Sequence, residues 1–169
     1  MRACIRRGSK QIGGSCIEVE QDGLRLLIDL GLPLDAPGNV AGLVPAGLTL
    51  DGSDPSLLGI LISHPHLDHY GLLAHVDGSI RIGLGAAARR ILAAASPFLP
   101  GIWPLPSVGW DYQSGQPIEI GPFTVTPYLV DHSAFDAYAL LIEAGGERLF
   151  YSGDFRGHGR KSALFERLV

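Results

Sequence analysis

Hydrophobic residues occur along this chain in short runs, separated by glycine, proline and other turn-forming residues. Runs of about four to eight residues bounded in this way favour β-strands over helices. The pattern predicts strands at 15–20 and 24–30 around an Asp22-Gly23 turn, and a buried strand at 57–63. Further strands are expected at 80–82, 118–120, 123–130, 137–143 and 148–151, with a Gly145-Gly146 turn before the last of them.

Helical patterning is limited to short segments. Helices are expected at 71–76, in the alanine-rich stretch 85–95, and from about residue 160 to the end. The segments 31–55 and 96–107 are rich in proline and poor in charge, and we expect a surface loop and an irregular lid there. Strands outnumber helices and alternate with them, which indicates an α/β protein with helices packed on a sheet.

Composition limits the possible functions only broadly. The 169 residues are 46% hydrophobic and 18% charged, as expected for a single globular domain over 1–169. A formal charge of −4 provides no general basic field, so any nucleic-acid binding must come from a local patch. Neither a signal peptide nor a membrane span is expected, and Cys4 and Cys16 are expected to be reduced thiols; these features favour a cytoplasmic protein.

The strongest chemical signal is the run His64-Pro65-His66-Leu67-Asp68-His69, directly after the buried strand. Imidazole and carboxylate ligands suit Zn²⁺, Mn²⁺ or Fe, and the absence of thiolate argues against a closed structural zinc site. If the loop bends, His64 and His66 can face one metal while Asp68 and His69 face a second. The competing interpretation is a histidine-rich surface loop, but four ligand-type residues within six positions favour the metal site.

Two other expected strands end in ligand-type residues. The strand at 123–130 leads into His132, and the strand at 148–151 leads into Asp154. Taken alone, each is more simply an ordinary loop residue. Because an active site at one sheet edge gathers side chains from several strand ends, both are predicted metal ligands here.

The order of these motifs resembles that of the metallo-β-lactamase-fold hydrolases. The resemblance rests on four segments: Ile-Asp-Leu-Gly (28–31), Ser-His-Pro-His-Leu-Asp-His-Tyr-Gly (63–71), Val-Asp-His-Ser-Ala-Phe-Asp-Ala-Tyr (130–138) and Tyr-Ser-Gly-Asp-Phe-Arg (151–156). The sequences of these segments are most similar to those of the ribonuclease J and β-CASP branch, which processes RNA or DNA. The resemblance implies an αββα sandwich and a dinuclear zinc hydrolase, with Mn or Fe as alternatives.

Carried over by position, the resemblance assigns a role to each motif residue. One metal would be held by His64, His66 and His132; the second by Asp68 and His69, with Asp154 bridging both. Asp29 would orient the site, and Asp68 would hold the metal-bound hydroxide that attacks the substrate.

The sequence also departs from this family. It contains neither the family's final histidine ligand nor a β-CASP domain, so the second half of the sandwich is expected to be incomplete. A water molecule or a second copy of the chain could fill the missing position, which makes a homo-oligomer possible. Arg156, His158, Arg160 and Lys161, with Ser133, are candidates for contacting phosphates; the alternative for these residues is an exposed polar loop.

Three functions remain in competition. The leading hypothesis is a phosphodiesterase acting on RNA; the second is a hydrolase of small thioesters, lactones or β-lactams; the third is a non-catalytic metal-binding or interaction module. Trp103, Trp110 and Tyr112 could stack on bases, although packing under the proline-rich loop is the simpler interpretation. Ser133 and Asp136 could support the His132 imidazole, His75 is expected on a helix surface or in the core, and Arg89 and Arg90 are expected on a solvated helix face.

Overall fold

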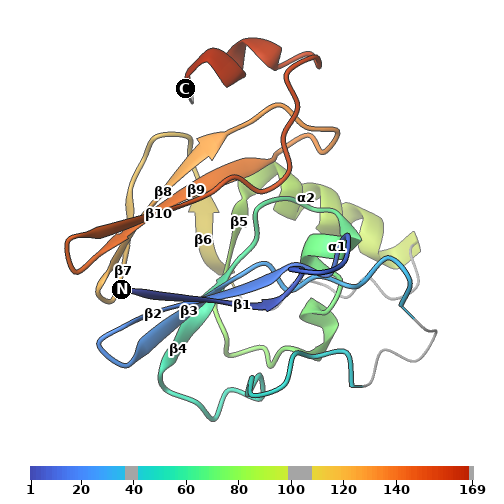
Figure 1. The fold of residues 1–169 in the computed structure, drawn as a ribbon. Helices are drawn as coiled ribbons and strands as arrows, with labels where there is room; N and C mark the ends of the chain where they lie inside the picture. Colours follow the sequence, from blue (N-terminus) through green and yellow to red (C-terminus); the bar gives the residue numbers. More distant parts are fainter. Residues whose placement is uncertain (37–41, 99–107, 168–169) are drawn as a thin grey trace.

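The computed structural model describes residues 1–36, 42–98 and 108–167, which form two β-sheets packed face to face (Figure 1). The first sheet contains, in spatial order, β1 (Arg2–Arg7), β2 (Cys16–Gln21), β3 (Leu24–Ile28), β4 (Leu57–Leu61), β5 (Ile82–Gly85) and β6 (Val108–Tyr112). The second sheet has the order β10 (Glu147–Tyr151), β9 (Tyr138–Ala144), β8 (Phe123–Leu129) and β7 (Ile118–Ile120).

Strand direction determines where the chain leaves each sheet. The β1–β2 and β2–β3 pairs are antiparallel, whereas β3, β4, β5 and β6 run parallel to one another. Because β3 and β4 are parallel neighbours, the residues that follow them, Asp29 and Ser63, emerge at the same sheet edge. The second sheet is antiparallel throughout.

The central strands β2, β3 and β4 divide their side chains between two hydrophobic cores. Along β3, Leu26 and Ile28 enter the core between the sheets, where they meet Phe123 and Leu140 of the second sheet. Leu27, between them in sequence, points to the opposite face and enters the other core. This period-two alternation follows from the pleat of a strand that is buried on both faces.

Short helices cover the outer face of the first sheet, on the side away from β8–β10 (Figure 1). They are α1 (Leu67–Tyr70), α2 (Ala86–Ala95) and the 3-10 helices η1 (Leu73–His75) and η2 (Ser96–Phe98). α2 buries Ala88 and Leu92. The carboxylate of Asp136 accepts hydrogen bonds from the Ala87 and Ala88 amides, and so satisfies donors that the first turn of α2 leaves unpaired.

The α/β fold with helices on a sheet is confirmed, with local corrections. β1 and β6 were not predicted; β1 is an edge strand with mostly exposed side chains, so it lacks the alternation that marks a strand. The helix expected at 71–76 is only η1, and the one expected from residue 160 is a 3-10 helix, η3 (Ser162–Arg167). Residues 99–107 of the expected lid lie outside the described residues.

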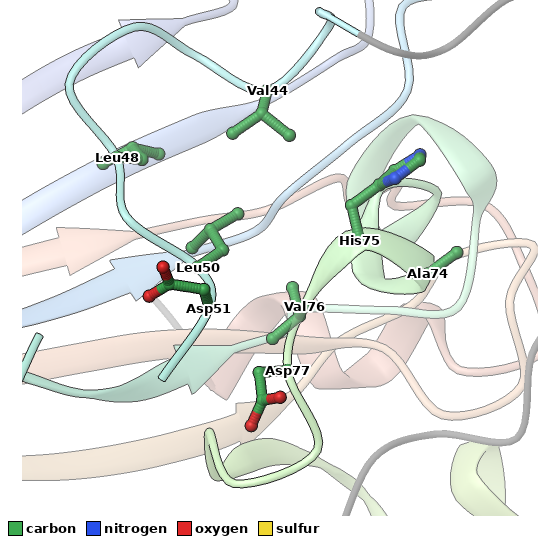
Figure 2. A pocket seen from close by; sticks show the side chains of 8 residues that line it. All are labelled: Val44, Leu48, Leu50, Asp51, Ala74, His75, Val76 and Asp77. Atoms are coloured by element: carbon green, nitrogen blue, oxygen red, sulfur yellow. The ribbon is translucent and has the colours of Figure 1, made fainter. Parts of the chain in front are cut away.

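The segment 31–55 is more than a surface loop. Leu50 is buried, and Leu43, Val44 and Leu48 pack against the core beneath the helices. An open hollow of about 510 Å³ lies between this segment and residues 74–77 (Figure 2). Its lining includes none of the predicted metal ligands. No helix within the described ranges is long and apolar enough to cross a membrane.

Candidate metal centre

The predicted ligands come from both sheets and meet at one edge of the sandwich. The contributing segments are the end of β3 (Asp29), the end of β4 with the turn α1 (His64, His66, Asp68 and His69), the segment after β8 (His132) and the segment after β10 (Asp154). Residues that are up to 125 positions apart therefore lie side by side.

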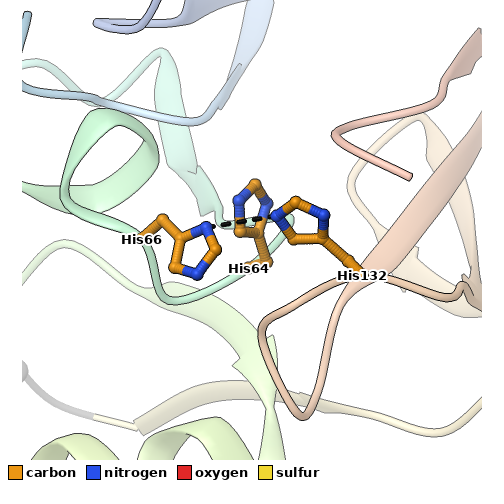
Figure 3. A group of neighbouring side chains, drawn as sticks. All are labelled: His64, His66 and His132. Carbon is orange, nitrogen blue, oxygen red and sulfur yellow. Dashed lines mark hydrogen bonds between the residues drawn. The ribbon is translucent and has the colours of Figure 1, made fainter. Parts of the chain in front are cut away.

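A first group consists of three histidines, His64, His66 and His132, whose ligand nitrogens all lie within 4.8 Å of one another. The three rings face a common centre (Figure 3). Nε2 of His132 lies 3.1 Å from Nδ1 of His66, and the His64 and His132 ring centroids are 4.6 Å apart. Three imidazoles at this separation have the donor chemistry of a zinc site with an open position.

A second group consists of His64, His69 and Asp154, again with all ligand atoms within 4.8 Å. Nε2 of His69 lies 3.6 Å from a carboxylate oxygen of Asp154 and 3.7 Å from one of Asp68. The other oxygen of Asp154 is 4.0 Å from Nε2 of His132, so this carboxylate lies between the two groups. His64 belongs to both, which extends the arrangement implied by the resemblance, where it belonged only to the first.

The ring of His64 carries the observation that best fits a metal. Its Nε2 is buried and has no hydrogen-bond partner among the described residues, although buried polar atoms are normally paired. Burial, reinforced by the neighbouring His69, His132 and His66, lowers the pKa of His64 from 6.5 to about 2. Burial and His66 also lower the pKa of His132. Both rings are therefore neutral near pH 7, which is the protonation state that binds a metal.

The carboxylate of Asp29 accepts the hydrogen bonds that connect the buried side of the site. Asp29 is 0% exposed and has a left-handed backbone, with φ of 57°, a conformation that is unusual for a residue other than glycine. One carboxylate oxygen accepts a hydrogen bond from the Ser63 amide at 2.7 Å. The other accepts from the Ser63 hydroxyl at 2.9 Å, the Tyr151 hydroxyl at 2.6 Å and Nδ1 of His69 at 2.7 Å. Burial lowers the pKa of His69, but the hydrogen bond and charge of Asp29 outweigh it, and the net shift is upward.

The turn that carries Asp68 is held by backbone contacts to two other segments. It begins at His66, whose extended backbone precedes α1. The Asp68 carbonyl accepts a hydrogen bond from the Ser15 amide at 3.1 Å. Gly31 approaches the same carbonyl so closely that a Cβ added there would overlap it. Glycine is therefore required at position 31 for close packing against the metal-binding turn.

The predicted phosphate-contacting residues lie on neighbouring loops, and two of their cations contact protein groups. Arg156 Nε is 3.6 Å from the Asp131 carboxylate, and Lys161 Nζ donates to the Phe135 carbonyl at 2.7 Å. Asp131 also accepts hydrogen bonds from backbone amides of the 156–161 loop. The remaining candidates, Ser133, His158 and Arg160, are exposed.

Comparison with known proteins identifies the family. Residues 10–163 match the family model of the metallo-beta-lactamase superfamily. The chain belongs to this superfamily. Its fold therefore agrees with the one implied by the motifs, and the helix–sheet–sheet layers seen here are those of a metallo-β-lactamase-like domain.

Among characterised relatives, the superfamily member most relevant to the motifs is ribonuclease J. The chain is 26% identical over 152 residues to ribonuclease J of Helicobacter pylori strain 26695, covering 88% of this chain and 22% of that protein. It is 25% identical over 155 residues to ribonuclease J of Mycoplasma pneumoniae, covering 88% and 27%. The chain thus spans about a quarter of these relatives.

Solved structures support the same fold. A protein of unknown function from Enterococcus faecalis V583 superimposes with a TM-score of 0.77 at 23% identity, over 98% of this chain and 46% of that one. A metallo-β-lactamase with a HARLDQ motif from Cronobacter sakazakii gives 0.62 at 21% identity, over 87% and 55%.

Several side expectations from the sequence are corrected. Tyr112 is buried, and Trp110 is half-buried against the Arg81 guanidinium, 4.2 Å from the ring centroid, so neither offers a free stacking face. Trp103 lies outside the described residues. Asp136 binds the start of α2. Arg89 forms an ion pair with Asp111 rather than lying on a solvated helix face. The exposed aromatic rings close to ligand residues in the chain are instead Phe135 and Phe155, at 71% and 48% exposure; one face of Phe155 stacks on Phe165, with ring centroids 5.7 Å apart.

Sequence reasoning missed two residues of the site, Ser63 and Tyr151. Ser63 lies between Asp29, His64 and His69, and Tyr151 reaches Asp29 from the second sheet. A signal for Tyr151 did exist, because it is the last residue of an expected strand whose alternation turns it toward the core, three positions before Asp154. Nothing in the sequence pointed to its contact with Asp29.

Proposed function

We propose that this domain is a metal-dependent hydrolase that binds two zinc ions and cleaves phosphodiester bonds, with RNA as its substrate. The observation that supports this proposal is that two groups of possible ligand atoms lie together at one sheet edge. His64 belongs to both groups, and Asp154 lies between them. Paired metal sites of this kind are used to hold both the attacking and the leaving oxygen of a displacement.

The choice of RNA is supported by the relatives rather than by a substrate pocket. The matches to ribonuclease J extend over 88% of the chain, and those proteins are named for an activity on RNA. The exposed side chains of His158 and of the cation Arg160, and the part-exposed ring of Phe155, lie on the segment that follows Asp154. Positive charge with an aromatic face is the combination that binds a single strand.

The position of each residue suggests its role in metal binding or in catalysis. His64, His66 and His132 would hold one ion, and His69, Asp68 and Asp154 the other. When bound, the ions supply Lewis acidity and activate water near neutral pH. Asp154, with a half-exposed side chain, lies on the open side of the site, where substrate enters. Asp68, with a side chain 20% exposed, is placed to accept a proton or to hold a water molecule by hydrogen bonding.

The test uses two phosphodiester substrates with the same protein. Wild-type protein with Zn²⁺ or Mn²⁺ should hydrolyse bis(p-nitrophenyl) phosphate and a single-stranded RNA oligonucleotide, and a chelator should abolish both activities. His66→Ala should remove activity by at least about 100-fold, whereas His75→Ala, at an exposed histidine outside the site, should leave it unchanged.

Other outcomes identify the alternatives. Hydrolysis of nitrocefin or a thioester without any phosphodiester activity would replace the proposal with a small-molecule hydrolase, the activity suggested by the names of several structural neighbours. Less than about half an equivalent of metal in the purified protein, together with no activity, would favour a non-catalytic module. Size-exclusion chromatography of the same sample tests the predicted homo-oligomer.

A further inference from the structure

The geometry points to Tyr151 as a positioning residue for the second metal-binding group, acting from the opposite sheet through Asp29. Tyr151 is the last residue of β10, where it pairs with Leu140, and its side chain crosses to the end of β3. Its hydroxyl donates a 2.6 Å hydrogen bond to the same Asp29 oxygen that accepts from Nδ1 of His69. This inference rests on the metal site of the proposed function and not on its substrate.

The hydrogen bonds around Asp29 fix which nitrogen of each ring carries the proton. Since Nδ1 of His69 donates to Asp29, the lone pair of that ring lies on Nε2, the atom near Asp68 and Asp154. Ser63 performs the same task for His64. Its hydroxyl donates to Asp29 and can then only accept from Nδ1 of His64, 3.0 Å away, which leaves the partnerless Nε2 of His64 as the ligand atom.

Tyr151 is the part of this network that comes from the second sheet. Asp29, Ser63 and His69 all follow strands of the first sheet and could keep their contacts with one another if the second sheet shifted. The Tyr151 hydrogen bond restrains the carboxylate against β10, three residues before Asp154. Removing the hydroxyl therefore gives more freedom to the carboxylate that orients His69. It also removes a restraint on the position of Asp154 relative to His69.

This reasoning predicts a selective effect on the two metal-binding groups. In Tyr151→Phe the His69 group should lose up to about tenfold in metal affinity, the lower end of the loss that follows removal of a ligand's own hydrogen-bond partner, because Tyr151 acts on His69 through Asp29. The group of His66 and His132 makes no hydrogen bond to Asp29 among those the structure describes, so its affinity should change less than twofold. Ser63→Ala should weaken both groups, because Ser63 contacts both His64 and His69.

The experiment is a titration with Co²⁺, followed by its visible absorption, in two backgrounds that each retain one group. With His132→Ala, which leaves the His69 group, adding Tyr151→Phe should weaken binding by up to about tenfold. With His69→Ala, which leaves the three-histidine group, adding Tyr151→Phe should have no effect beyond twofold. Tyr112→Phe, at a tyrosine that is also buried, is the matched control for losing a buried hydroxyl and should leave both affinities unchanged.

A second measurement separates positioning from general destabilisation. Two-dimensional ¹⁵N NMR of the histidine rings in metal-free protein, recorded at a pH high enough that the His69 ring is neutral, should report His69 protonated on Nδ1 in the wild type and a mixture of both forms in Tyr151→Phe. Equal Co²⁺ affinities with and without Tyr151→Phe in the His132→Ala background, or equal losses in both backgrounds, would overturn the inference. If wild-type protein itself binds no Co²⁺, the proposed function fails instead.

Discussion

Gly31 provides the sharpest test of how the metal-binding turn is held in place. A Cβ built on Gly31 would lie 1.7 Å from the carbonyl oxygen of Asp68, whereas real Cβ atoms essentially never approach other atoms within 3.0 Å. Gly31→Ala must therefore push the turn carrying Asp68 and His69 away by roughly 1.3 Å. Because a misplacement of about 1 Å costs about 100-fold in catalysis, the proposed phosphodiesterase activity should fall by about that factor.

The effect should be local, which the assay can show. Co²⁺ titration should find metal binding weakened in Gly31→Ala, most strongly for the His69 group, because His69 directly follows Asp68 and its amide is tied to the His66 carbonyl within the displaced turn. Gly78→Ala is the control, because a Cβ there meets nothing within 4 Å. If Gly31→Ala binds two equivalents with wild-type affinity and keeps wild-type activity, the turn is not held by this packing and the reasoning is wrong.

Three further predictions follow from burial and exposure. Below pH 6.5 His64 becomes protonated in the unfolded chain but not in the folded protein, because its pKa is lowered on folding. The free energy of unfolding of metal-free protein, measured by urea titration, should therefore fall by about 2 kcal/mol between pH 6.5 and 5, and by less in His64→Asn. The pKa of His69 is raised on folding, so its contribution to stability is lost above pH 6.5 instead. Phe123→Ala, in the core between the sheets, should cost about 3–5 kcal/mol in the same assay, against about 0.5 kcal/mol for Phe150→Ala at a half-exposed ring; equal losses would contradict the two-sheet core. Phe155→Ala should raise KM for an RNA oligonucleotide about tenfold and leave bis(p-nitrophenyl) phosphate unaffected; a parallel change in both would exclude base stacking.

The strands that form the core, and the polar residues that follow them, could be predicted from the sequence. The buried strand 57–61 is an almost continuous apolar run, and 123–129 begins with alternating apolar and polar residues; the polar residues that follow such strands can be recognised one by one. β1 escaped prediction because an edge strand with exposed side chains has no such pattern. The packing of Leu50 and its neighbours was missed because proline and glycine usually mark exposed loops.

Apart from the shared metal ligands, hydrogen bonds between the sheets could not be predicted. The hydrogen bond from Tyr151 to Asp29 joins residues 122 positions apart, and only the packed sandwich brings them together. The same holds for Arg156 and Lys161, whose sequence suggested free cations but whose charges meet Asp131 and a backbone carbonyl. Side-chain chemistry can be read from one residue, whereas its partner depends on the whole fold.

The convergence of the ligands from both sheets has a consequence for stability. His64, His66 and His69 extend from the first sheet, and His132 and Asp154 from the second, so an ion bound by both sets is a crosslink between the two layers. Binding to the folded state alone adds about 4.1 kcal/mol when free metal is 1,000 times the Kd. A bound ion would therefore reinforce the apolar core that already joins the two sheets, and removing the metal would make the domain easier to unfold and to digest with a protease.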